Sequence, residues 1–120
     1  MAARFTELIV DASDPPALAE FWKAVLGWKE TGAYGGEVVE IADPGGTRPT
    51  MVFVPVSDPK TVKNRLHIDL NPVGAAQGEE LQRLLALGAS PADVGQADQD
   101  WVVLADPEGN EFCLLRKTVS

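Results

Sequence analysis

Ile41-Ala42-Asp43-Pro44-Gly45-Gly46 is repeated in this sequence as Leu104-Ala105-Asp106-Pro107-Glu108-Gly109, 63 positions later. A second pair of landmarks, Leu26-Gly27 and Leu87-Gly88, lies in the same order and is 61 positions apart. Each Leu-Gly follows a helix-like segment, and each Asp-Pro follows an apolar, strand-like segment. Two landmarks at nearly the same offset predict two copies of a module of about 60 residues.

Both landmarks have a local physical cause. The pattern Asp-Pro-x-Gly is typical of a type I turn, because Asp caps the turn, Pro fixes φ and Gly suits the last position. Leu-Gly is typical of a helix end, since glycine accepts the left-handed conformation that closes the last turn. Each copy is therefore predicted to end its helix at Leu-Gly and to join two strands through its Asp-Pro turn.

Hydrophobic periodicity predicts one strand, one helix and three further strands in each copy. In the first copy, a helix over 15–26 places apolar residues from Leu18 to Val25 on one face, and Asp14 is its expected N-cap. The predicted strands are 4–11, 28–33, 37–42 and 50–56 in the first copy and 65–71, 91–95, 100–105 and 110–117 in the second, whose helix spans 76–87. The fold class is thus α+β, with two tandem βαβββ modules.

The chain has 120 residues, the length of one ordinary domain. We expect a single domain over 1–120, with module one at 1–56, a connection at 57–64 and module two at 65–120. The connection carries Lys60 and Lys63 beside Arg65, a positive cluster in an acidic protein. These cations form either a solvated connection or an anion contact near the mouth of a pocket.

Composition narrows the classes of function. Ten Lys and Arg residues stand against eighteen Asp and Glu residues, which gives a formal net charge of −8. Because duplex binding is driven by basic groups, we expect no nucleic-acid partner. Cys113 is the only cysteine, which excludes an internal disulfide and a thiolate zinc cluster. No apolar run is long enough to span a membrane, and the N-terminus meets Glu7 too early for a signal peptide. We expect a cytoplasmic protein without a membrane partner.

The clearest strand signal is the alternation of apolar and polar residues over 65–71. His67, the only histidine, shares a face with Asp69, while the apolar residues from Leu66 to Leu70 face the other way. The apolar face is predicted to pack on a helix and the polar face to look into a cleft. There His67 is either a general base that Asp69 orients or a hydrogen-bonded polar residue without chemistry.

Glu111 follows the second Asp-Pro turn and shares a strand face with Cys113, opposite Phe112 and Leu114. A carboxylate that faces a cleft is a metal ligand, a general base or a contact for a cationic group, whereas its ordinary role is an exposed strand carboxylate. His67 and Glu111 are the candidate catalytic residues. Since no basic neighbour is evident to lower the thiol pKa, Cys113 is predicted to be half-buried and inert, a contact for a ligand at most.

Three stretches resemble the vicinal oxygen chelate superfamily, which includes glyoxalase I, bleomycin-resistance proteins and extradiol dioxygenases. They are Phe21-Trp22 with Leu26-Gly27-Trp28, the run from Lys63 to Leu70, and Asp106-Pro107-Glu108-Gly109-Asn110-Glu111-Phe112. Together they look most like the small bacterial glyoxalase-like domain subgroup, over essentially the whole chain. The resemblance implies that the two modules pair into a half-barrel cleft. In metal-dependent members, the first and last strands of each module supply the ligands of a divalent ion.

Applied position by position, the resemblance makes His67 and Glu111 ligands from the second module. In the first module, Glu7 stands where the family has a histidine. Residues 48–53 contain no carboxylate, so the fourth ligand is missing. A triad of Glu7, His67 and Glu111 would bind Zn, Mn, Ni or Fe. The departures at half of the positions are instead typical of a branch without a cofactor, which we expect here.

Two strand aromatics, Phe53 and Trp101, either form the wall of a ligand pocket or pack in the core. The complete ligand-binding set predicted from the sequence is Glu7, Phe53, His67, Asp69, Trp101, Glu111 and Cys113.

The resemblance implies three functions. The first is binding of a small molecule in the cleft without the full metal site, as in relatives that sequester cationic antibiotics. The alternative is a divalent-metal-dependent lyase or isomerase of the glyoxalase type, and the third is metal-free acid–base catalysis by His67 and Glu111. The 2-His-1-carboxylate iron site of an extradiol dioxygenase is excluded within one chain, because there is one histidine. Relatives are commonly two-fold dimers, so we expect a homodimer.

Overall fold

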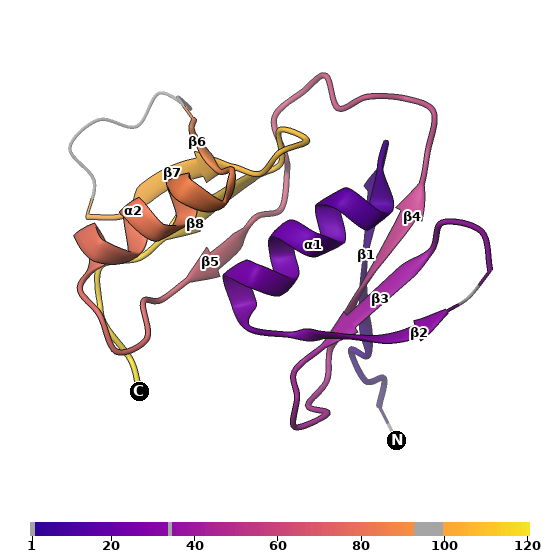
Figure 1. Cartoon of the computed structure of the whole chain (residues 1–120), viewed down its shortest axis with the longest axis horizontal. Coiled ribbons are helices and arrows are strands. Elements are labelled where there is room, and N and C mark those ends of the chain that lie inside the picture. The colour runs from indigo at the N-terminus through magenta and orange to yellow at the C-terminus, as the bar shows by residue number, and fades with distance from the viewer. Residues whose placement is uncertain (1, 34, 93–99) are drawn as a thin grey trace. The chain divides into compact units, whose positions relative to one another are not determined.

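The computed structural model describes residues 2–33, 35–92 and 100–120 (Figure 1). The chain divides into two compact units, residues 1–59 and residues 60–120, and the division falls inside the predicted connection. In the described part of the chain, each unit contains one helix and one four-stranded sheet. That both units make up one domain, paired into a half-barrel cleft, stays a prediction.

The first unit contains one strand, then a helix, then three strands. Its elements are β1 (Glu7–Ala12), α1 (Pro15–Leu26), β2 (Lys29–Ala33), β3 (Val39–Ala42) and β4 (Thr50–Pro55). The sheet order is β1-β4-β3-β2, in which β1 runs parallel to β4 and the other pairs are antiparallel. Helix α1 packs against this sheet and buries Leu18, Phe21, Trp22 and Val25, the apolar face that the periodicity predicted.

The second unit repeats this arrangement. Its elements are β5 (Ile68–Leu70), α2 (Gln77–Leu87), β6 (Ser90–Pro91), β7 (Val102–Ala105) and β8 (Glu111–Leu114). The sheet order is β5-β8-β7-β6, again with the first and last strands parallel. The predicted α+β class, with a βαβββ module occurring twice, is therefore confirmed. Neither described helix has the length and apolar character of a membrane-spanning segment.

The end signals of helix α1 act as predicted. The Asp14 side chain accepts a hydrogen bond from the backbone N–H of Ala17 at 3.2 Å, so it caps α1. Gly27 closes the same helix with φ 68°, a conformation that costs glycine little. Helix α1 begins and ends at the predicted residues, and α2 begins one residue later than predicted.

The second Asp-Pro turn joins β7 to β8 and fixes where β8 begins. One Asp106 carboxylate oxygen accepts from the backbone N–H groups of Glu108 and Asn110, at 2.9 and 3.0 Å. The backbone N–H of Gly109, at φ 88°, donates to the carbonyl oxygen of Asp106. Asp106 is 3% exposed, so these bonds satisfy a buried carboxylate. Because the turn ends at Asn110, β8 begins at Glu111.

The strand predicted at 65–71 is shorter in the structure. β5 pairs with β8 only from Ile68 to Leu70, and Leu66 is 84% exposed, so its predicted place on a buried apolar face was wrong. The physical reason lies in the register of β5 and β8, which sets residues 65 and 66 opposite Gly109 and Asn110. These two residues belong to the Asp106 turn and not to β8, so the ladder offers no partner there. Of the strand predicted at 91–95, residues 93–95 lie outside the described residues.

Alternation in the second sheet divides its residues between two faces. Leu104, Phe112 and Leu114 are fully buried on one face, and the fully buried Leu84 comes from α2. Gln77, at the start of α2, donates to the carbonyl oxygen of Leu114 at 3.2 Å, which ties the helix to β8. The intervening residues of β5, β7 and β8 therefore project from the opposite face.

We expect Leu84→Ala to destabilise the protein, because this is the one side chain of α2 that is fully buried among the described residues. The free energy of unfolding should fall by about 2–5 kcal/mol, the usual cost of removing a buried leucine. The matched control is Leu87→Ala on the same helix, where the side chain is 37% exposed and the loss should stay below about 1 kcal/mol. Urea denaturation measures both, and equal losses would contradict this packing of α2.

Candidate ligand pocket

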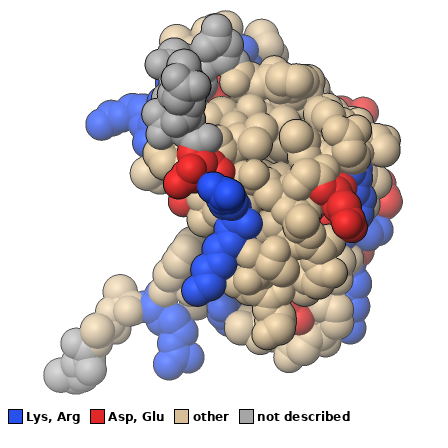
Figure 2. All heavy atoms as spheres, turned by 90° about the vertical axis from the view of Figure 1, so that its left-hand side faces the viewer, with Lys and Arg blue, Asp and Glu red and all other residues tan. Residues whose placement is uncertain are grey.

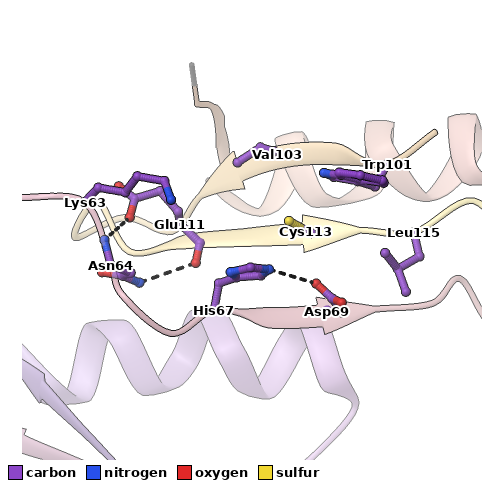
Figure 3. Close-up of a pocket in the computed structure, with 9 residues that line it drawn as sticks. All are labelled: Lys63, Asn64, His67, Asp69, Trp101, Val103, Glu111, Cys113 and Leu115. Carbon is purple, nitrogen blue, oxygen red and sulfur yellow. Dashed lines mark hydrogen bonds and ion pairs between the residues drawn. The ribbon is translucent and has the colours of Figure 1, made fainter. Parts of the chain in front are cut away.

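A pocket of about 310 Å³ opens on the face of the second sheet opposite α2 (Figure 3). All of its lining residues belong to the second unit. They are Lys63, Asn64, His67, Asp69, Trp101, Val103, Glu111, Cys113 and Leu115. The volume lies at the lower end of the range for small-molecule sites.

Strand register explains why these residues meet. Asp69 of β5 and Val103 of β7 both pair with Cys113 of β8, so their side chains form one row across the sheet. Glu111 lies two positions before Cys113 in β8, so its side chain projects from the same face of the sheet. The alternation predicted for β8, with Glu111 and Cys113 facing away from the buried Phe112, is confirmed by the pocket lining.

Glu111 lies at one end of the pocket and is bound by its own chain. One carboxylate oxygen accepts from Lys60 Nζ and the other from the backbone N–H of Asn64, both at 2.8 Å. Burial alone would raise the pKa of Glu111. The Asn64 hydrogen bond and the Lys60 ammonium outweigh it, so the pKa lies below its ordinary value. Of the positive cluster in the connection, Lys60 is thus an anion contact, and its anion is the Glu111 carboxylate.

His67 and Asp69 lie together along the pocket wall. His67 Nε2 is 3.3 Å from an Asp69 carboxylate oxygen, and about half of each side chain is exposed. Figure 3 shows the imidazole pointing toward Asp69, beside β8. The structure therefore places the predicted pair in contact, with room for either side chain to rotate.

Cys113 differs from its neighbours because it is 6% exposed. Burial raises the pKa of its thiol, and the charge and hydrogen bond of Asp69 raise it further, while Lys63 opposes them. The thiol is therefore protonated at neutral pH and is not an activated nucleophile. Its position in the pocket, deeper than the predicted half-buried one, makes it a contact for a bound molecule.

Three apolar side chains also line the pocket. Trp101 and Leu115 lie at the end away from Glu111, whereas Val103 lies in the row of Cys113 between the two ends (Figure 3). Trp101 is 36% exposed, so part of its ring is accessible. The sequence did not identify Val103 and Leu115, although both follow from the alternation of β7 and β8. Asn64 was also missed, because its role depends on a contact with Glu111, 47 positions away.

Two residues of the predicted site lie in the first unit and do not line this pocket. Glu7 is exposed at the start of β1. Phe53 is fully buried in β4, among the core residues of that unit, and offers no exposed surface to a ligand. Their assignment to a ligand site stays a prediction that this pocket does not support.

The metal ligand set implied by the resemblance does not fit these residues. Both carboxylate oxygens of Glu111 are already bound by Lys60 and Asn64. In the first unit, the stretch 48–53 offers the Thr50 hydroxyl, which donates to Glu40 at 2.9 Å. An ion at the family's position would have to displace these internal contacts.

Comparison with solved structures assigns the fold to the glyoxalase, bleomycin resistance and dioxygenase class. The fosfomycin resistance protein FosX of Listeria monocytogenes, in complex with Mn(II) and 1S,2S-dihydroxypropylphosphonic acid, matches with a TM-score of 0.75 at 14% identity. That match covers 99% of this chain and 96% of FosX. A glyoxalase/bleomycin resistance protein/dioxygenase family enzyme of Burkholderia phytofirmans matches with a TM-score of 0.63 at 18% identity, over 93% of this chain and 97% of that one.

A possible glyoxalase of Bacillus cereus matches with a TM-score of 0.68 at 17% identity, over 95% of this chain and 99% of that one. At the level of sequence, the model of the glyoxalase-like domain matches residues 7–115. The chain therefore belongs to the glyoxalase-like domain family, as the motifs predicted. No curated protein matches the sequence.

We expect Lys60→Met to destabilise the protein, because the substitution keeps the apolar stem but leaves the Glu111 carboxylate without its ammonium partner. The side chains of Lys60 and Glu111 are only 21% and 15% exposed, so water compensates poorly. The free energy of unfolding should fall by about 1–3 kcal/mol. In the control Lys117→Met, at an exposed lysine, the loss should stay within about 0.5 kcal/mol. Urea denaturation at neutral pH measures the free energy of unfolding of both variants. Equal losses in Lys60→Met and Lys117→Met would refute a stabilising role for Lys60.

Proposed function

We propose that this glyoxalase-like protein binds a small organic molecule in the pocket of its second unit, without using the metal set of its family. The observation that carries the proposal is the state of Glu111. Lys60 and Asn64 occupy both of its oxygens, so this carboxylate holds the pocket wall together. What is left for a ligand is a partly enclosed space between polar and apolar residues.

The lining supports a ligand with two chemically different ends. Trp101 and Leu115 at one end, with Val103 beside Cys113 in the middle, suit a flat or apolar body, because burying apolar surface there is favourable. At the other end, Lys63 and His67 suit a polar or anionic group. Preorganised polar groups beside an apolar wall are the usual arrangement of small-molecule sites.

The net charge of −8 gives little support for a purely cationic ligand. Glu111 is paired with Lys60, and Asp69 lies against His67. Basic and acidic side chains are interspersed on the face shown in Figure 2, and most of its described surface is uncharged. Local pairing of charges supports an amphiphilic ligand over a bare cation.

Catalysis remains the alternative. A divalent-metal-dependent lyase or isomerase of the glyoxalase type requires that Glu111 release Lys60 and Asn64. FosX of Listeria monocytogenes, which is similar in fold, binds Mn(II) in its solved complex, and this supports the metal-dependent alternative. Metal-free acid–base catalysis is favoured by the contact between His67 and Asp69. Glu111 contributes less to it, since a carboxyl group with a lowered pKa is a weak base. The homodimer, the cytoplasmic location and the lack of nucleic-acid or membrane partners stay predictions.

The test is a screen of aromatic compounds with polar or charged head groups against chelator-treated protein. A compound bound at a hundred times its dissociation constant should stabilise the fold by about 2.7 kcal/mol, which a thermal shift detects. Trp101→Ala should weaken binding about tenfold, because stacked aromatic contacts contribute about 0.5–1.5 kcal/mol beyond burial. The matched control is Phe5→Ala, an exposed aromatic of the first unit, which should bind as the wild type does.

The binding proposal and the two catalytic alternatives predict different results in this screen. Compounds that bind equally well to Trp101→Ala, or the lack of any binding, would refute the proposed site. Turnover that disappears with chelator would support the metal-dependent enzyme, and turnover that survives chelator would support acid–base catalysis.

A further inference from the structure

Three different metal-binding side chains converge on one wall of the pocket. His67 lies just before β5, Asp69 is in β5, and Cys113 is the residue of β8 that pairs with Asp69. Their ligand atoms all lie within 4.8 Å of one another. Figure 3 shows the imidazole, the carboxylate and the thiol on neighbouring strands, facing the same space.

We propose that His67, Asp69 and Cys113 form a binding site for Zn²⁺ or a similar borderline-soft divalent cation. The donor set decides the class of ion. A thiolate and an imidazole suit Zn²⁺, whereas Mg²⁺ and Ca²⁺ need mainly oxygen ligands. The site shares His67 with the ligand set of the family and replaces the two glutamates by Asp69 and Cys113.

The distances allow the site to close through side-chain rotation. Bonds of about 2.0–2.3 Å around a tetrahedral ion place its ligand atoms about 3.5 Å apart. His67 Nε2 and Asp69 are already 3.3 Å apart. Cys113 is fixed in the centre of the strand ladder, while the half-exposed His67 and Asp69 are free to rotate toward it. No strand has to move.

Local charge favours this position over the one at Glu111. Asp69 brings a carboxylate to the ion, and the thiol of Cys113 becomes a thiolate when it binds the ion and releases its proton. Lys63 also lines the pocket and opposes a cation, but its side chain is long and exposed, so it is able to swing away. At Glu111, by contrast, an ion would have to displace the Lys60 ammonium 2.8 Å away.

Three protein ligands leave a coordination position of a tetrahedral ion open toward the pocket, where water or a small molecule is able to bind. The ion site does not depend on the proposed small-molecule binding, because it is built from side chains alone. It is therefore tested with the metal and no organic ligand.

The experiment titrates untagged, reduced and metal-stripped protein with Co²⁺, an optical substitute for Zn²⁺. We expect one equivalent to bind, with a near-ultraviolet charge-transfer band from thiolate to cobalt, and Zn²⁺ to abolish the band by displacement. Since Cys113 is the only cysteine, the band reports on this site alone. Calorimetry with Zn²⁺ supplies the affinity.

Variants identify the ligands. Cys113→Ser should remove the band and weaken Zn²⁺ binding by at least about tenfold, because even groups that merely support metal ligands contribute about 10–100-fold. His67→Ala and Asp69→Asn should weaken binding similarly. They change exposed side chains, so they keep the test valid if Cys113→Ser does not fold. Glu111→Gln should retain the band, as should the control Glu79→Gln at an exposed carboxylate of α2.

Three results would overturn the site: no binding of either ion, Co²⁺ binding without the thiolate band, or binding that Glu111→Gln weakens and Cys113→Ser does not. The last of these would place the ion at the ligand set of the family. Failure here would leave the compounds that bind in the presence of chelator unaffected, so the two proposals fail separately.

Discussion

The carboxylate of Glu111, at the start of β8, holds the segment before β5 against the sheet of the second unit. By accepting from Lys60 Nζ and the Asn64 backbone, it draws the chain before β5 onto the first residue of β8. The β5–β8 ladder begins at Ile68, because the residues opposite 65 and 66 lie in the Asp106 turn, and Leu66 stays exposed. His67 is then free of the ladder and able to turn toward Asp69. This partly buried contact therefore helps to shape the pocket wall.

The fold was predictable because its signals are local. The Asp14 cap, Gly27 and the Asp106 turn are each satisfied by atoms within four residues, so their conformations depend little on the rest of the chain. Strand alternation likewise assigned Glu111 and Cys113 to the same face. The Leu-Gly and Asp-Pro signals occur twice, in the same order, and this was sufficient to identify two βαβββ units.

The site was less predictable because its chemistry depends on distant pairs. The sequence identified Glu111 as a candidate ligand but not that Lys60, 51 positions earlier, neutralises it. Asp69 and Cys113 meet only through the parallel register of β5 and β8, which no turn between them specifies. Cys113 was expected to be inert because no basic residue lies near it in sequence. Its relevant neighbours are instead an imidazole and a carboxylate.

In both units, the polar residue that opens the last strand is held by contacts within its own unit. In the first, Thr50 opens β4 and donates to the buried Glu40, which also accepts from Thr31, each at 2.9 Å. In the second, Glu111 opens β8 and accepts from the connection. No buried side-chain nitrogen or oxygen among the described residues lacks a partner. Removing one partner of such a group costs more than removing an ordinary surface contact. The ion site that we propose at Cys113 avoids this cost, because it leaves Glu111 and its two partners in place and takes its other ligands from the half-exposed His67 and Asp69.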